Sequence, residues 1–516
     1  MKRHKSLLAF FTVLTGCAGF LQAQGVPVIE KFLTNGMRLL MVERHDEPTV
    51  AGGWVTHVGS VNERPGMTGI AHLFEHMMFK GTPTIGTRDY QKDLEIITAQ
   101  EKVREELRQE ERRMRAELRQ GKIDDLLKPE NKSPRYKELE QEFQKLVAEQ
   151  RKILVKNEFD RIYTSSGASG MNAFTSQDMT AYHINVPANK LELWMWMESE
   201  RLLHPVFREF YSERDVVFEE RRMRTESTPL GKFSEQFNSM VWKSSPYSWP
   251  IVGWPSDIPA ISKAQADDFY ATYYSPQNIT LILIGDLNPE RTEAAIRQYF
   301  ERIPRGLKEP PEMVTEETKQ LAEQRMSAEA ETNPQIDIVW HTVGFQHPDS
   351  YALEILGQIL STRTGRLYKG LVLGSGVATD VFAMQQNQKY AGLFYLSSEV
   401  KEGHKPAELE AGIHGIVETL RNEDVPAAEL QKVKNNFAAA EYRRLTSNSA
   451  ILMQLIRKDG SGDWREINTA GAKYQAVTAA DLRRVAQKYL TRENRTVAVY
   501  TRKGNQTAAS DSKINP

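Results

Sequence analysis

The chain has 516 residues, of which 40% are hydrophobic and 26% charged, an ordinary globular composition with room for more than one domain. Its 67 Lys and Arg residues nearly cancel its 68 Asp and Glu residues, so the net charge of −1 gives no electrostatic basis for binding nucleic acid or an anionic membrane. Cys17 is the only cysteine. Unless Cys17 is retained in the mature chain, any metal site has to be built from His, Asp and Glu.

The N-terminus predicts an exported protein. A basic start and an apolar run, followed by Ala23 as a small residue for cleavage, are typical of a secretory signal peptide over residues 1–23. No stretch of the chain is apolar for long enough to cross a bilayer, so we expect no transmembrane span. We expect a periplasmic protein. Residues 14–17 also resemble a bacterial lipobox, which makes a lipid anchor on Cys17 the alternative.

Strand patterns follow the predicted signal peptide. Apolar runs at residues 28–32 and 37–43 flank an Asn-Gly step, which is a strong signal for a β-hairpin. A third strand is predicted over residues 50–58, and a helix is predicted to begin near Gly69.

Residues 89–159 predict a charged helical-hairpin insertion in the N-terminal half. Apolar residues recur there at spacings of three, four and seven, which indicates helices with one narrow apolar seam. Two prolines within residues 128–134 break the helical pattern between them. We expect the two seams to pack mainly against each other, and the rest of the protein to fold without this hairpin.

The chain also repeats itself. Residues 262–283 align without gaps on residues 478–499, an offset of 478 − 262 = 216, and both segments predict a helix followed by an apolar strand. The fold class is therefore predicted as α+β, with two homologous halves. The predicted domains are an N-terminal metal-bearing domain (27–303), a charged, Pro-rich linker (304–332), a C-terminal homologous domain (333–505) and a disordered tail (506–516).

His72, Glu75 and His76 form the motif that carries the chemistry. Residues four apart on a helix lie on one face, about 6 Å apart, so both imidazoles can reach one ion. Glu75 flanks that ion without needing to bind it, which suits a general base. The alternative is a pair of surface histidines, and the apolar residues 77–79 beside the motif disfavour it.

A catalytic zinc needs a third protein ligand and keeps its fourth position for water. The candidates are Glu213, Glu219 and Glu220, in a predicted helix. Glu213 and Glu220 are seven residues apart and share one face, so one could bind the metal while the other supports the site. Spacing alone leaves Glu219 possible.

The inverted order His-x-x-Glu-His, followed by residues 77–82, resembles the insulinase/pitrilysin family of zinc peptidases, the inverzincins. Residues 172–182 and 213–220 are similar to further segments of that family. The resemblance implies two α/β-sandwich halves that form a clamshell, one Zn²⁺ per chain, and endopeptidase activity on peptides or unfolded polypeptides.

The same resemblance implies roles for individual residues. His72, His76 and Glu220 would bind the metal, Glu75 would activate water, and Glu213 would support the site. Asn172 and Ala173 would border the substrate cleft. From the sequence we also expect a strand edge near residues 53–59 to pair with the substrate backbone.

Two features depart from the family pattern. The interval from His76 to Glu220 is 220 − 76 = 144 residues, longer than is usual, and the helical hairpin accounts for it. Val372 and Thr379 stand where relatives carry a substrate-binding Arg and Tyr. We therefore expect a catalytic subunit that pairs with a homologous metal-free subunit, or a homodimer. A non-catalytic structural or assembly subunit of the same fold is the alternative.

Overall fold

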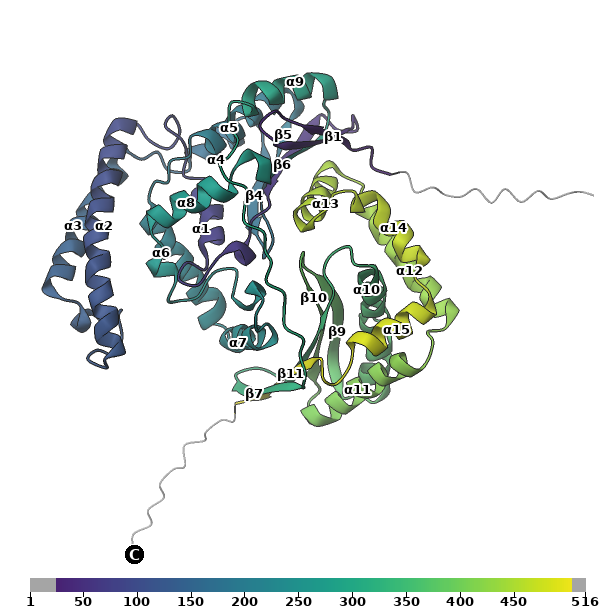
Figure 1. Ribbon diagram of the computed structural model, residues 1–516. Helices are drawn as coiled ribbons and strands as arrows, with labels where there is room; N and C mark the ends of the chain where they lie inside the picture. The colour runs from purple at the N-terminus through teal and green to yellow at the C-terminus, as the bar shows by residue number, and fades with distance from the viewer. Residues whose placement is uncertain (1–24, 504–516) are drawn as a thin grey trace, which may run out of the picture.

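The computed structural model describes residues 25–503 (Figure 1). The predicted signal peptide, Cys17 and the predicted tail lie outside the described residues. Two mixed β-sheets, each with its own helices, confirm the predicted α+β class with two halves. Among residues 25–503, no helix is long and apolar enough to cross a membrane.

The first sheet has six strands in the order β1-β2-β6-β3-β5-β4. They are β1 (Ile29–Phe32), β2 (Arg38–Glu43), β3 (Thr49–Thr56), β4 (Ser169–Thr175), β5 (Thr180–Pro187) and β6 (Ile279–Gly285). The predicted hairpin is confirmed, with β1 antiparallel to β2. The expected strand edge near residues 53–59 is wrong, because β3 lies between β6 and β5. Its buried, apolar character on both faces is typical of a central strand.

Helices cover one face of this sheet and form the main core. The helices of this half are α1 (Ile70–Met77), α2 (Tyr90–Arg119), α3 (Pro134–Ile153), α4 (Glu158–Ser165), α5 (Leu191–Leu203), α6 (Phe210–Arg221), α7 (Gly231–Val241), α8 (Lys263–Tyr273) and α9 (Pro289–Phe300). Trp54 of β3 is fully buried in this core with Phe74 of α1, Trp194 of α5 and Phe269 of α8. The metal-motif helix is therefore held rigidly against the sheet.

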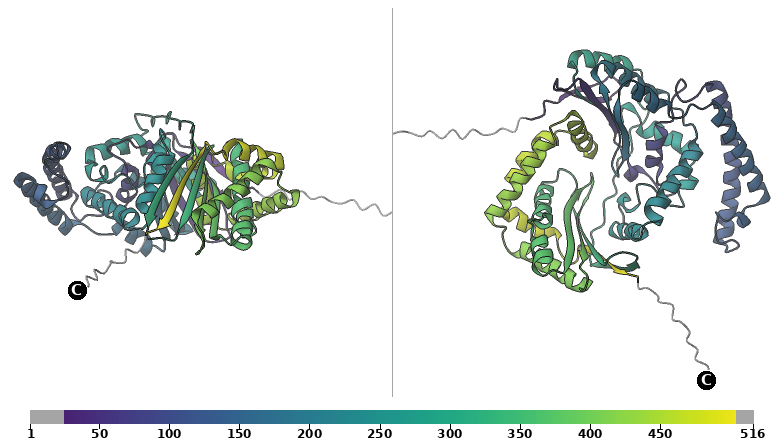
Figure 2. Two further views of the ribbon diagram at one scale, coloured as in Figure 1. Left: turned by 90° about the horizontal axis from the view of Figure 1, so that it is seen from below. Right: turned by 180° about the vertical axis from the view of Figure 1, so that it is seen from behind.

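The insertion forms the predicted helical hairpin, in which α2 and α3 run side by side along one flank of the molecule (Figures 1 and 2). The two apolar seams were expected to pack mainly against each other, but part of each seam packs on the rest of the domain. Leu107 of α2 and Phe143 of α3 belong to the main core, and Phe143 packs edge-on against Tyr211 of α6 with ring centroids 5.7 Å apart. Arg108 also donates to the Tyr211 hydroxyl at 3.1 Å. The near half of the hairpin is thus packed on α6.

The second sheet has five strands in the order β7-β11-β8-β10-β9. They are β7 (Gln324–Ala330), β8 (Gln335–Thr342), β9 (Ala378–Asn387), β10 (Gly392–Val400) and β11 (Arg495–Arg502). β7 lies inside the range expected to be linker, so that expectation is wrong beyond residue 323. β7 is an edge strand with alternating exposed residues, so no apolar run marks it in the sequence.

The two sheets share one topology. Without β1, the first sheet reads β2-β6-β3-β5-β4, and each pair matches the second sheet in direction, beginning with a parallel pair. The sequence offset recurs in the structure: α15 (Ala479–Tyr489) begins 479 − 263 = 216 residues after α8, and β11 begins 495 − 279 = 216 residues after β6.

One helix from each half packs on the sheet of the other half. The second half also contains α10 (Pro348–Ser361), α11 (Pro406–Asn422), α12 (Ala427–Arg443), α13 (Asn448–Ser461) and α14 (Glu466–Ala476). Ile451 and Leu455 of α13 pack on the first sheet, on the face opposite α1, against Leu40 and Ile282. In return, α7 packs on the second sheet through residues such as Phe237. Figure 1 shows α13 beside the first sheet and α7 beside β7 and β11.

Candidate metal centre

The helix that carries the motif is anchored at its amino end. Gly69 precedes α1 with φ of 92°, a left-handed conformation that suits glycine. The Glu63 carboxylate accepts hydrogen bonds from the backbone N–H groups of Gly69 and Ala71, both at 2.8 Å. A carboxylate at this end satisfies free N–H groups and complements the helix dipole. Sequence reasoning missed Glu63, which lies outside the usual capping positions.

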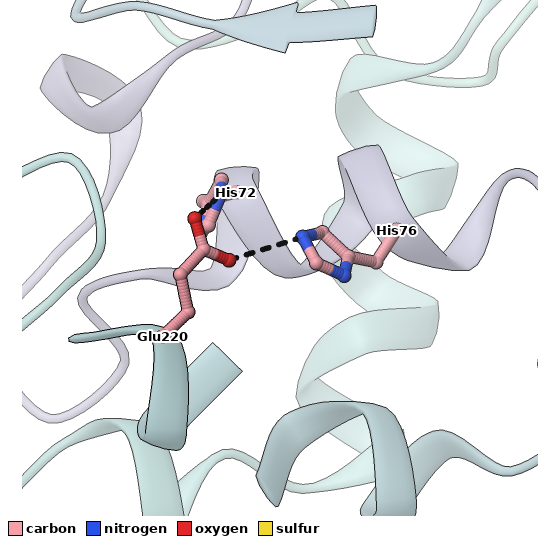
Figure 3. A group of neighbouring side chains, drawn as sticks. All are labelled: His72, His76 and Glu220. Carbon is pink, nitrogen blue, oxygen red and sulfur yellow. Dashed lines mark ion pairs between the residues drawn. The ribbon is translucent and has the colours of Figure 1, made fainter. Parts of the chain in front are cut away.

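The structure brings His72, His76 and Glu220 together (Figure 3). Glu220 Oε1 lies 3.7 Å from His72 Nε2, and Glu220 Oε2 lies 3.5 Å from His76 Nε2. One donor atom from each of the three residues lies within 4.8 Å of the other two. Glu219 is not part of this group. Its carboxylate pairs with Arg222 at 2.8 Å and is 54% exposed.

These three side chains fit a zinc ion. Ligands bound tetrahedrally at about 2.1 Å lie about 3.4 Å from one another, close to the two observed separations. Burial, together with the nearby charges of His76 and Arg224, lowers the pKa of His72 to about 3, so its ring is neutral and able to bind a metal. The three donors are two imidazole nitrogens and one carboxylate oxygen, which are ligand types that zinc binds in proteins.

Glu75 lies beside the group and is held by its own hydrogen bond. Thr175 of β4 donates its hydroxyl to Glu75 Oε2 at 2.7 Å. Burial raises the pKa of Glu75, although the Thr175 bond acts to lower it. A carboxylate with a raised pKa can both accept and return a proton near neutral pH. Thr175 was not predicted as a site residue, because its contact joins positions 100 residues apart.

Glu213 supports the far side of His76. Its Oε2 lies 3.5 Å from His76 Nδ1, and its other oxygen contacts the Lys80 ammonium. Burial acts to raise the pKa of Glu213, but the bond to His76 and the charge of Lys80 outweigh it and lower the pKa. Glu213 thus contacts His76 on the nitrogen that faces away from Glu220, and it is not one of the three converging donors.

Arg224 is a further charged neighbour that sequence reasoning missed. It lies on a π-helical turn (Arg222–Glu226) that continues α6, and its Nη1 is 2.7 Å from Glu220 Oε1. The side chain is 74% exposed. The spacing of four from Glu220 was a usable signal, since such pairs face each other on a helix.

A cavity of about 630 Å³ opens from Glu75 and His76. Asn172 and Ala173 line it, as predicted residues of the substrate cleft would. Both lie on β4, which pairs only with β5 among residues 25–503 and so forms one edge of the sheet. Every described residue that lines this cavity lies between positions 75 and 213, so the C-terminal half contributes none of them.

Two family models match the chain. Residues 38–109 match the model described as insulinase (peptidase family M16), and residues 260–437 match the M16 inactive domain. The chain belongs to the insulinase family, M16. In this insulinase-family chain the motif residues lie inside the first match, and the whole metal group lies outside the inactive-domain match.

Relatives of the insulinase family agree over most of the length. The chain is 24% identical to zinc protease PqqE of Helicobacter pylori over 89% of both proteins. Its fold is similar to a crystal structure of a protease from Helicobacter pylori, with a TM-score of 0.74, 22% identity, and 92% and 99% of the two chains covered. It is also similar to the periplasmic protease PqqL from Escherichia coli (TM-score 0.67, 16% identity), covering 92% of this chain but 47% of that one.

Proposed function

We propose that this chain is a zinc-dependent endopeptidase that hydrolyses peptides or unfolded polypeptides. The observation that carries the proposal is the group of His72, His76 and Glu220 with the Glu75 carboxylate beside it. Two imidazoles and a carboxylate with a nearby base form the arrangement that metal-assisted hydrolysis requires. The zinc proteases among its relatives support the same reading.

In the proposed reaction, a bound zinc would polarise the scissile carbonyl and acidify water. Glu75 takes the proton from the attacking water and returns it to the leaving amine. The Thr175 hydroxyl fixes the carboxylate in place for both transfers. Glu213 holds the His76 ring through Nδ1, which orients Nε2 toward the metal position.

The substrate backbone would be bound by β4. Its free edge presents unpaired N–H and C=O groups beside Glu75, so an extended peptide can add to the sheet as a further strand. Asn172 and Ala173 are the proposed contacts on this strand. The interior strand β3, by contrast, has no free backbone groups of this kind.

We further propose that the active form is an oligomer with a homologous metal-free subunit, or else a homodimer. The cavity takes its lining from residues 75–213, and neither Val372 nor Thr379 reaches it. A second subunit would supply hydrogen-bond donors for the substrate that this chain does not place there. Full activity of the isolated monomer would contradict this pairing.

The proposed location is the periplasm, with a lipid anchor on Cys17 as the alternative. The relative PqqL from Escherichia coli is described as periplasmic, and the basic, apolar N-terminus of this chain fits export.

The test combines metal analysis with a peptide assay. Purified protein should contain one zinc per chain and cleave unstructured peptides, and a chelator should abolish cleavage until zinc is restored. Zinc-loaded protein that cleaves no peptide, alone or with its homologous partner, would favour the structural-subunit alternative.

A further inference from the structure

The base of the α2–α3 hairpin contains a buried polar cluster. Asp93 of α2 forms an ion pair with Arg208, and both side chains are at most 1% exposed. Gln150 of α3 donates to Asp93 Oδ1 at 2.8 Å, and Gln100 of α2 donates to Gln150 Oε1 at 3.1 Å. Both helices of the insertion are thereby joined to Arg208, two residues before α6.

Arg208 also holds the loop that follows the metal-motif helix. Its two terminal nitrogens donate to the carbonyls of Thr82 at 2.6 Å, Ile85 at 2.9 Å and Lys80 at 3.2 Å. Gly81 and Gly86 both have positive φ and lie so close to Arg208 that an added Cβ would come within 3.1 Å of Nη1. The loop is shaped around this guanidinium.

The same loop is one wall of the cavity beside Glu75 and His76. A second, adjoining wall is residues 154–159, where the chain returns from the hairpin. The two walls are bonded to each other: Val155 N–H donates to the Gly86 carbonyl at 3.0 Å, and Gly86 N–H donates to Glu158 at 2.7 Å. The chain therefore leaves for the hairpin along one cavity wall and comes back along the other.

We propose that the base of the hairpin is part of the substrate-binding cavity, and that Asp93 is a positioning residue that sets its width through Arg208. The inference rests on the proposed peptidase function. Paired with Asp93, Arg208 keeps a fixed orientation and gives its remaining donors to the loop carbonyls. Without that anchor, the loop at residues 80–86 is free to move away from residues 154–159, and the cavity loses its selectivity for the substrate side chain beside the scissile bond.

A purely stabilising role explains the cluster less well. Buried ion pairs are often replaceable by apolar side chains without loss of stability, whereas an apolar side chain cannot satisfy three backbone carbonyls. The ion pair fixes the orientation of Arg208, and Arg208 in turn holds the loop that forms one cavity wall.

The test compares Asp93→Asn with Asp124→Asn in the full zinc-loaded chain. Asp124 is the matched control, because it also pairs with a cation but lies exposed at the hairpin tip. Gln150→Ala is the second variant. It removes the hydrogen bond from Gln150 to Asp93 but leaves the Asp93 carboxylate in place, so it tests the proposal if Asp93→Asn does not fold.

Two readouts are measured. In Asp93→Asn and Gln150→Ala, amide hydrogen exchange should rise at residues 80–88 and 154–159 and stay unchanged in α1. The ratio of kcat/KM between peptides with a large and a small residue beside the scissile bond should fall by about tenfold, with zinc affinity unchanged. The Asp124→Asn protein should match the wild type in both.

Unchanged exchange in a folded variant would overturn the proposal, and so would faster exchange with unchanged selectivity. If the wild-type protein cleaves no peptide, alone or with its homologous partner, the proposed function fails, and exchange at the two cavity walls still decides whether Asp93 positions them.

Discussion

Asp459 Oδ1 lies 2.6 Å from Arg38 Nη1, although the two residues are 421 positions apart in the sequence. Asp459 belongs to α13 and is fully buried, and its other oxygen lies 2.8 Å from His57 Nε2. The carboxylate therefore fastens a helix of the C-terminal half to β2 and to the end of β3 in the N-terminal half.

This contact predicts an acid-sensitive stability. Burial acts to raise the pKa of Asp459, but His57 and Arg38 outweigh it and lower the pKa from 3.8 to about 2. The ionised carboxylate thus stabilises the fold above about pH 4, and this contribution, roughly 2 kcal/mol, is lost as the pH falls toward 2. Denaturation of the metal-free protein at pH 5 and pH 3 should show a smaller loss in Asp459→Asn than in wild type. Asp463→Asn, a substitution at a partly exposed position just after α13, is the control. Equal losses in wild type and Asp459→Asn would contradict the assignment.

Glu75→Gln should keep zinc and lose hydrolysis. Glu75 is not one of the three converging donors, so the metal group stays intact while proton transfer is removed. The loss should be about 10²- to 10⁴-fold in kcat. Zinc content and peptide cleavage are measured together, with Glu219→Gln as the control on exposed α6 surface. Undiminished turnover by zinc-loaded Glu75→Gln would show that another group is the base.

Removing acids from α6 should separate their roles. Glu220→Ala should lose most of its zinc affinity, Glu213→Ala should lose about 10- to 100-fold, and Glu219→Ala should lose none. These losses differ because the three carboxylates contact different groups. Glu220 faces both imidazoles, whereas Glu213 contacts only Nδ1 of His76 within the metal group, and Glu219 pairs with Arg222. Competition with a coloured chelator gives the three affinities. If Glu219→Ala strips the metal and Glu220→Ala does not, the proposed ligand is wrong by one residue.

Arg224→Ala should weaken zinc binding by about tenfold, because Arg224 holds one oxygen of the Glu220 carboxylate in place. Arg222→Ala is the matched control, since it removes a neighbouring arginine paired with Glu219 instead. Competition titrations of both variants show whether the zinc affinity falls or rises. Tighter zinc binding by Arg224→Ala would mean that repulsion between the guanidinium and the ion outweighs its positioning of the ligand.

Shortening the hairpin should be tolerated only beyond its contacts with α6. Replacing residues 109–138 with a short Gly/Ser turn leaves Leu107, Phe143 and Tyr211 packed, so folding and zinc affinity should match the wild type. Removing residues 89–159 entirely should give insoluble protein, because core side chains and Arg208 lose their partners. Soluble yield and cooperative unfolding are the measurements. Normal folding after the complete deletion would show that the insertion is dispensable, as the sequence alone suggests.

Local patterns predicted much of this protein. The motif helix, the first β-hairpin, the helical insertion and the 216-residue repeat each depend on residues close in the chain or on an ungapped alignment. The interior position of β3 in the sheet could also have been predicted, because its residues are apolar on both faces.

The parts that escaped prediction depend on contacts between distant residues. Thr175 meets Glu75 across 100 positions, and Arg208 meets Asp93 across 115. No spacing rule links such pairs, since only the folded sheet and the packing of α6 bring them together. A single sequence contains the residue types but not their partners.

The exchange of α7 and α13 has a consequence for folding. Each sheet uses a helix from the other half to cover an apolar face, which Leu40, Ile282 and their neighbours form in one case and Val339 and Leu393 in the other. A separately expressed half would leave that face open to water and to other chains. The repeat in the sequence therefore marks two copies of one architecture but not two autonomous folding units, and we expect the protein to unfold in a single concerted transition.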